Sequence, residues 1–502
     1  MGQIRKQAIF SSIVIYIGFF IGFINTWFFT RNGSFLPEQY ALTRLFFDVG
    51  QIMFAFANLG VISVIYKFYP YYKDNLAAKD NDLMTWSFCA VLIGFSLVVI
   101  GGLIFEPLVV QKFIGRSPLF VDYYKWVFPF GLGILLFTVV ESLSGSVRKT
   151  IYPAFLRETV FRLITTLLIV LYLFQVVDFD VFIKLFALSF LIIVVLLVIS
   201  LVKNKHLHLN FTVSRVTKKF RTKMLTLAGF IFSGQVIFIL SQVMDSIFIA
   251  SLLGLIPTGI YALASYIANL IQIPQRSITA IAIPTLAQAW KDKNMIEIDR
   301  IYKRSSINLL LAAMFIFCGI WLNIEDAFRL LNTQAEYATG LSVIFILGVS
   351  RIIDAGTGVN SQIIGTSTQW RFEFITGALL LLMILPLNYI LIKKTGIEGS
   401  AYANLISFTV YNLIRFIFLW KRFQLQPFSS KTIVSIVTAV VAYFISYYLF
   451  SQMNGWMGII LRSTVFTILF FSSIFAFKLT PDAMQLVDVV KKRLKPPSPK
   501  GG

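Results

Sequence analysis

The chain has 502 residues, of which 57% are hydrophobic and only 13% are charged. Soluble domains are about half apolar and about one quarter charged, so this composition excludes an ordinary soluble protein and favours a membrane protein. The net charge of +21 is divided among many short loops. That distribution argues against a nucleic-acid partner and indicates loops that contact anionic membrane lipids.

Continuous apolar runs recur along the whole chain, and each is long enough to cross a bilayer as a helix. The sequence therefore predicts an all-α integral membrane protein with about 14 transmembrane helices. No signal peptide is expected, because the first run is too long and no small-residue cleavage site follows it. The predicted spans are 8–29, 40–66, 83–106, 120–145, 152–175, 180–202, 225–252, 258–288, 305–324, 341–366, 370–392, 397–420, 432–450 and 457–477.

Lysine and arginine residues are concentrated in alternate loops between these spans. If the N-terminus lies in the cytoplasm, most of the loop cations lie there too, including those of segment 203–224 and of the C-terminal tail. The positive-inside rule therefore predicts a multi-pass protein of the cytoplasmic (inner) membrane with both termini in the cytoplasm.

Two stretches of the chain resemble each other at an offset of 221 residues: "YALTRLFFDVGQI" at 40–52 and "YALASYIANLIQI" at 261–273. They occupy equivalent points in two sets of six spans, so a parallel repeat is expected. The predicted organisation is an N-terminal six-helix bundle (1–202), a basic cytoplasmic linker (203–224), a second six-helix bundle (225–424), two extra transmembrane helices (425–478) and a basic cytoplasmic tail (479–502).

Several charged and polar residues lie inside the apolar runs, where a charge costs roughly 2.5–3.5 kcal/mol on insertion scales. Such residues pair with one another or face a wet cavity. Arg44 and Asp48, four residues apart, share one helix face, and so do Arg351 and Asp354, three apart. The candidate site residues are the cations Arg44, Arg276 and Arg351, the carboxylates Asp48, Asp245 and Asp354, and the polar residues Gln51, Asn269 and Gln272.

Four stretches of the chain carry a resemblance to a known family. They are "LPEQYALTRLFFDVGQIMFAFANLGVISVIYKFYP" (36–70), "DSIFIASLLGLIPTGIYALASYIANLIQIP" (245–274), "AIPTLAQAW" (282–290) and "GIEGSAYANLIS" (396–407). With them the chain resembles the O-antigen type oligosaccharide flippases of the multidrug/oligosaccharidyl-lipid/polysaccharide exporter superfamily. The resemblance implies a MATE-like fold, with two six-helix bundles in a V and two further C-terminal helices.

The same resemblance implies a function. The expected substrate is a polyprenyl-pyrophosphate-linked oligosaccharide, flipped across the cell inner membrane by alternating access for lipopolysaccharide O-antigen or exopolysaccharide assembly. Polysaccharide polymerases and glycosyltransferases would be neighbours in that process. Arginine binds phosphate oxygens through two donors, so we expect Arg44, Arg276 and Arg351 to line a cationic cavity between the halves. Asp48, Asp245 and Asp354 are candidates for coupling to H+ or Na+, or for ion pairing.

Two other functions stay open: an ion-coupled multidrug exporter of the same superfamily, with a more acidic cavity, and a peptidoglycan lipid-precursor flippase. No enzyme is expected, because the sequence has no P-loop, nucleotide-binding glycine cluster or HExxH motif. No cofactor or metal is expected either. Cys89 and Cys318 lie in apolar spans, and His206 with His208 lacks the cysteine or carboxylate of a metal site, so a solvated surface pair is expected.

Overall fold

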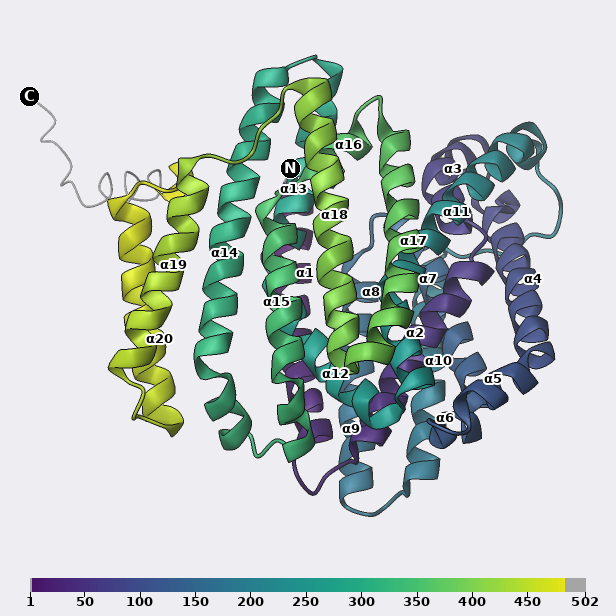
Figure 1. Cartoon of the computed structure of the whole chain (residues 1–502). Helices are drawn as coiled ribbons and strands as arrows, with labels where there is room; N and C mark the ends of the chain where they lie inside the picture. The colour runs from purple at the N-terminus through teal and green to yellow at the C-terminus, as the bar shows by residue number, and fades with distance from the viewer. Residues whose placement is uncertain (1, 484–502) are drawn as a thin grey trace, which may run out of the picture. The chain divides into compact units, whose positions relative to one another are not determined.

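The structure, a computed structural model, describes residues 2–483, and its regular elements in that range are all helices (Figure 1). The chain divides into two compact units, residues 1–262 and 263–502. Most of the predicted basic tail lies outside the described residues. The division at 262 does not coincide with the linker at 203–224, and the repeat boundary at that linker stays a prediction.

Unit 1 is built from the helices that precede residue 263. Two single turns and one π-helical turn interrupt the series. The helices are α1 (Gly2–Thr30), α2 (Pro37–Ala57), α3 (Val61–Asn75), η1 (Ala78–Asp80), α4 (Leu83–Ile104), α5 (Glu106–Phe113), α6 (Pro118–Asp122), η2 (Tyr124–Trp126), α7 (Val127–Ser146), α8 (Ile151–Phe155), the π turn η3 (Leu156–Val160), α9 (Phe161–Leu173), α10 (Phe179–Lys203), α11 (Arg215–Leu252) and the first half of α12 (Leu255–Asn269).

Unit 2 contains the second half of α12 and all later helices. They are η4 (Leu270–Gln272), α13 (Ile273–Lys291), α14 (Met295–Leu330), η5 (Ala335–Gly340), α15 (Leu341–Gly356), α16 (Asn360–Thr366), α17 (Trp370–Thr395), α18 (Ile397–Phe423), α19 (Ser430–Leu449) and α20 (Gly455–Ala476).

Within the described residues, 11 helices are long and apolar enough to cross a membrane, or 12 if α2 and α3, bent by 53° at their junction, form one span. The chain is therefore a multi-pass membrane protein, although 14 spans are not confirmed. The predicted span 152–175 is broken by the π turn η3, which carries Arg157 and Glu158. In the predicted span 8–29, only Ile17–Thr30 qualifies, as a shorter apolar helix.

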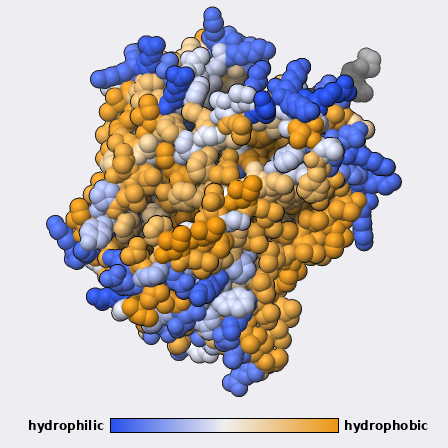
Figure 2. All heavy atoms as spheres, turned by 90° about the vertical axis from the view of Figure 1, so that its right-hand side faces the viewer, coloured by the Kyte–Doolittle hydropathy of each residue, from blue (hydrophilic) through white to orange (hydrophobic). Residues whose placement is uncertain are grey.

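The outward face of α4 shows how these helices meet lipid. Along it Ile93, Leu97 and Ile104 are each more than 60% exposed. Soluble proteins rarely expose contiguous apolar surface on this scale. Figure 2 shows a broad apolar area on one face of the molecule, with hydrophilic side chains gathered toward its margins. The exposed apolar side chains of α4 therefore contact lipid tails instead of other protein side chains.

Helix α11 packs inside unit 1, against α2 and α3. Gly60, between α2 and α3, has a φ of +74°, and a Cβ there would lie 2.2 Å from the carbonyl oxygen of Ala228 on α11. Only glycine permits this left-handed backbone and this close approach. Nearer the loop end, Phe68, Tyr72 and Val216 belong to one buried apolar cluster.

The last two helices, α19 and α20, lie side by side along α14 in unit 2 (Figure 1). Buried residues of the three helices share one apolar cluster that includes Leu310, Ala439 and Phe466. A buried ion pair between Asp326 on α14 and Arg462 on α20 supports the contact. The two extra helices are therefore attached by both apolar packing and paired charge.

Candidate functional site

The polar residues of unit 1 gather where α2, α11 and α12 meet. Tyr40 is only 1% exposed, and its hydroxyl accepts a hydrogen bond of 3.0 Å from Nε of Arg44. The guanidinium carbon lies 5.2 Å from the centroid of the same ring, within cation–π range. The i,i+4 spacing on α2 therefore orients Arg44 through its tyrosine neighbour.

The carboxylates of this cluster come from two helices. Asp245 on α11 is 8% exposed and accepts a 2.9 Å hydrogen bond from the hydroxyl of Tyr261 on α12. Asp48 on α2 lies beside Ser246 and within electrostatic range of Arg44 and Asp245. Two acids and an arginine thus share one part of unit 1, an arrangement that sequence spacing alone could not have shown for Asp245.

Unit 2 has its polar cluster at two breaks in helices that the sequence predicts as continuous spans. The first break is η4, where α12 ends and α13 begins with Pro274 in its first turn. The second is at 357–359, between α15 and α16, where Gly358 has a φ of +67° and lies against Ser305 and Ser306. The Ser306 hydroxyl donates to the carbonyl of Gly356, which the break leaves without its helical partner.

Asp354, one turn before the second break, is held by neutral amides. Nε2 of Gln272 and Nε2 of Gln275 each donate to Oδ2 at 3.2 Å, and Nδ2 of Asn412 donates to Oδ1 at 3.0 Å. Asn412 is 1% exposed, and its own Oδ1 accepts bonds from Thr357 and Asn360. Four elements thus converge on a single carboxylate.

Within the described residues, no ion pair joins Arg351 to Asp354, although their i,i+3 spacing places them on one helix face. Its guanidinium carbon lies 5.5 Å from the ring centroid of Phe408 on α18. Its Nε is buried and, within the described residues, has no hydrogen-bond partner. A buried guanidinium donor without an acceptor is costly, and a bound anion would remove that cost.

Three further candidate residues lie at exposed or half-buried positions. Arg276 on α13 is exposed and forms no ion pair with any residue that the structure describes. Asn269, at the end of α12, is exposed, and Gln51 on α2 is half-buried. Arg44, Asp48, Gln51 and Asp245 belong to unit 1, whereas the other candidates belong to unit 2. A cavity lined jointly by the arginines of both units therefore stays a prediction.

Two other pairs of charged residues in the predicted spans form ion pairs. Arg162 contacts Glu158, four residues earlier, at 2.9 Å, and Arg415, which is 2% exposed, pairs with Glu373. These residues stabilise helix packing and leave no charge for a ligand. Sequence reasoning missed Asn412, whose only signal is an amide side chain inside the predicted span 397–420. Among the described residues, no group of three or more His, Cys, Asp or Glu side chains could hold a metal ion.

No protein-family model and no curated protein sequence matches the chain. Solved structures share its fold. The lipid II flippase MurJ, in an inward closed conformation, aligns over 95% of this chain and 99% of its own, with a TM-score of 0.70 and 19% identity. An inward-facing multidrug resistance transporter of the MATE family, in the MOP superfamily, aligns over 82% of this chain and 94% of its own, with a TM-score of 0.63 and 15% identity.

A MOP superfamily transporter from Pyrococcus furiosus aligns over 84% of this chain and 96% of its own, with a TM-score of 0.55 and 15% identity. The predicted all-helical, MATE-like fold class is therefore confirmed. At these identities the likeness establishes the fold alone. The substrate has to be argued from the residues of this chain.

Proposed function

We propose that the protein is a flippase that moves a polyprenyl-pyrophosphate-linked oligosaccharide across the cytoplasmic membrane for surface polysaccharide assembly. The observation that carries the proposal is Arg351, a guanidinium with a buried donor that has no partner among the described residues, on the helix α15 that ends at the second break of unit 2. Broken helices inside membrane transporters are common places for substrate and ion sites. A pyrophosphate supplies the acceptor oxygens that this guanidinium lacks.

Arg276 and Arg44 would extend the cationic lining. Arg276 is exposed on α13, the helix that supplies Gln275 to the Asp354 cluster. Arg44 would contribute from unit 1, positioned by Tyr40. Alternating access then moves the charged headgroup past these cations while the lipid tail stays in the bilayer. Energy would come from H+ or Na+ at Asp48, Asp245 or Asp354, since a buried carboxylate can exchange either ion between states.

A peptidoglycan lipid-precursor flippase is a second candidate, and one observation favours it over a drug exporter. The lipid II flippase aligns with 95% of this chain, whereas the MATE structures cover 82–85% of it. Its substrate is also a lipid-linked, anionic glycan precursor. The exporter hypothesis expects an acidic cavity for cationic drugs, and it does not explain an unpartnered arginine.

Substitution of Arg276 by glutamate tests the cationic lining. In proteoliposomes, Arg276→Glu should reduce flipping of a pyrophosphate-linked oligosaccharide by more than tenfold, because an anion would face an anionic substrate. Lys394→Glu is the matched control: it makes the same charge change at an exposed residue near the end of α17. Normal flipping by Arg276→Glu at normal membrane abundance would remove Arg276 from the site. Parallel assays with lipid II and with a cationic dye distinguish the two alternatives.

A further inference from the structure

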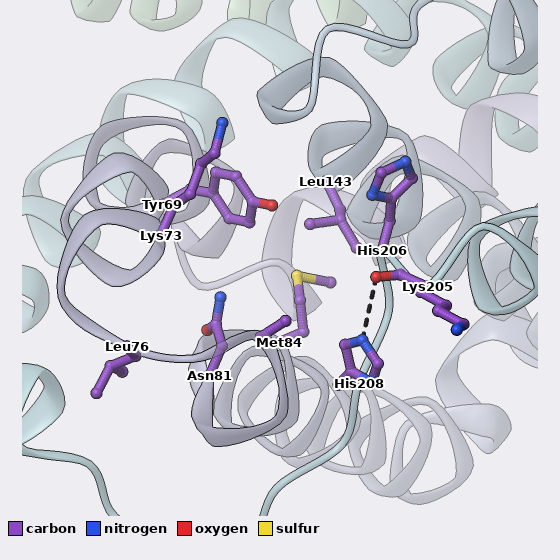
Figure 3. A pocket seen from close by; sticks show the side chains of 10 residues that line it. Tyr69, Lys73, Leu76, Asn81, Met84, Leu143, Lys205, His206 and His208 are labelled. Carbon is purple, nitrogen blue, oxygen red and sulfur yellow. Dashed lines mark hydrogen bonds between the residues drawn. The ribbon is translucent and has the colours of Figure 1, made fainter.

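A cavity of about 210 Å³ lies within unit 1, at the end where α3 meets α4 and where α10 is followed by segment 204–214 (Figure 3). The charge pattern of the loops predicts that this end faces the cytoplasm. No aspartate or glutamate is among the residues that line the cavity. They are Tyr69, Lys73, Leu76, Ala78, Asn81, Met84, Leu143, Lys205, His206 and His208.

Several side-chain hydrogen-bond donors around this cavity have no acceptor among the described residues. In Figure 3 the hydroxyl of Tyr69 points into the cavity toward Leu143, and His206 lies on the far side of Leu143, with Lys73 and Lys205 at the edge of the cavity. Within the described residues, the Tyr69 hydroxyl, the His206 imidazole and the Lys73 ammonium have no hydrogen-bond or ion-pair partner. The side-chain oxygen of Asn81 accepts from the backbone of Leu83, so its amide N–H groups stay available. Several donors therefore meet without an acceptor.

The wall formed by segment 204–214 is fixed in place. The carboxylate of Asp82, which is fully buried, accepts from the Ser214 backbone at 2.9 Å and from the Thr217 hydroxyl at 2.7 Å. The Asn210 backbone donates to Thr85 at 2.8 Å. Because these bonds fasten the segment to the start of α4, the two histidines are held against α3 and α7 and form a preorganised wall.

The charged groups that act on His206 are basic. Partial burial lowers the pKa of His206, and Lys149 and His208 add to the effect. Nε2 of His208 bonds to the backbone oxygen of Lys205 at 3.0 Å, so this nitrogen carries the hydrogen. Imidazole, hydroxyl and amide donors, with lysine side chains at the edge, favour an anion with several acceptor oxygens. A phosphate group has that chemistry and fits the volume.

Neighbouring residues indicate where the phosphate comes from. Immediately after His208, Leu209 is 60% and Phe211 is 71% exposed, while Asn210 between them bonds back to the protein. Apolar side chains exposed beside a basic segment are typical of protein surfaces that lie in the membrane interface. We propose that this cavity binds the phosphate of an anionic lipid headgroup at the membrane surface, separately from the transported substrate.

The chain itself supplies the probe, because it has only two histidines and both line the cavity. The full-length protein, purified in dodecyl maltoside through a histidine-free tag, is treated with diethyl pyrocarbonate at neutral pH. Peptide mass spectrometry then gives the rate at which each imidazole is modified. Phosphatidylglycerol, inorganic phosphate and phosphate-free diacylglycerol are added in separate arms at matched ionic strength.

Phosphatidylglycerol should protect His206, and diacylglycerol should not. In Lys73→Ala the lipid concentration for half protection should rise about tenfold, as expected for loss of one charged hydrogen-bond donor. Tyr69→Phe, which removes only a hydroxyl, should raise the lipid concentration for half protection as well. Lys218→Ala, at an exposed position of α11, should leave that concentration unchanged. Equal protection by inorganic phosphate would support the phosphate site and assign it a soluble ligand. Equal shifts in all three variants, or no protection by either phosphate compound, would overturn the proposal.

Discussion

The two polar clusters satisfy their carboxylates in different ways. In unit 1, Asp48 and Asp245 share their surroundings with Arg44 and with tyrosine hydroxyls, so an arginine lies among the acids of the cluster. In unit 2, Asp354 is held by three amide donors, while Arg351 sits apart on Phe408. The acid of unit 2 therefore does not need its arginine, and that arginine can serve a ligand.

The largest effect on stability should come from removal of the Asp354 carboxylate. Asp354→Ala leaves the amide groups of Gln272, Gln275 and Asn412 without an acceptor, at a cost of about 3 kcal/mol in unfolding free energy. Thermal or denaturant unfolding in detergent measures it. Asp354→Asn retains one oxygen and should lose about half as much. If Asp354→Ala unfolds like the wild type, the amide cluster is not a stabilising network.

Asp245→Ala should have the next largest effect. It removes the acceptor of the buried Tyr261 hydroxyl, so a loss of about 2 kcal/mol is expected. The double variant Asp245→Ala/Tyr261→Phe measures the interaction between the two side chains. If they interact, the double variant should lose less unfolding free energy than the sum of the losses of the two single variants. Strict additivity in the same unfolding assay would show that the two side chains do not interact in the folded protein.

Arg351→Met should affect stability less than Asp354→Ala or Asp245→Ala, and transport most. It removes the contact with Phe408, worth about 1 kcal/mol, but it also removes a buried donor that lacks a partner among the described residues. Flipping should fall by more than tenfold with the melting temperature nearly unchanged. Arg415→Met, which breaks the ion pair with Glu373, is the comparison variant. Its main effect should be a loss of stability rather than a loss of flipping.

Gln51→Leu and Asn269→Ala should have the smallest effects on stability, within about 0.5 kcal/mol. Gln51 is half-buried and Asn269 is exposed. Unfolding curves and flipping rates of both variants would be compared with those of the wild type. A large transport defect in either stable variant would place that residue beside the substrate.

The membrane-spanning pattern could be predicted from sequence because hydropathy reports the solvent of each segment directly. The π-helical break at η3 could not be predicted in this way, because its residue Arg157 pairs with Glu141 on the separate helix α7, at 2.8 Å. Spacing placed Arg351 and Asp354 on one face, yet the partners of Asp354 come from η4, α13 and α18. Contacts between residues so distant in the chain are invisible to local periodicity.

The most direct test of the central claim measures flipping of a fluorescent polyprenyl-pyrophosphate-linked oligosaccharide in proteoliposomes by the wild type, Arg351→Lys and Arg351→Met. If the cation neutralises the pyrophosphate, the wild type flips the lipid, lysine retains part of the rate and methionine loses it. No flipping by the folded wild type, or equal rates for all three proteins, would contradict the account.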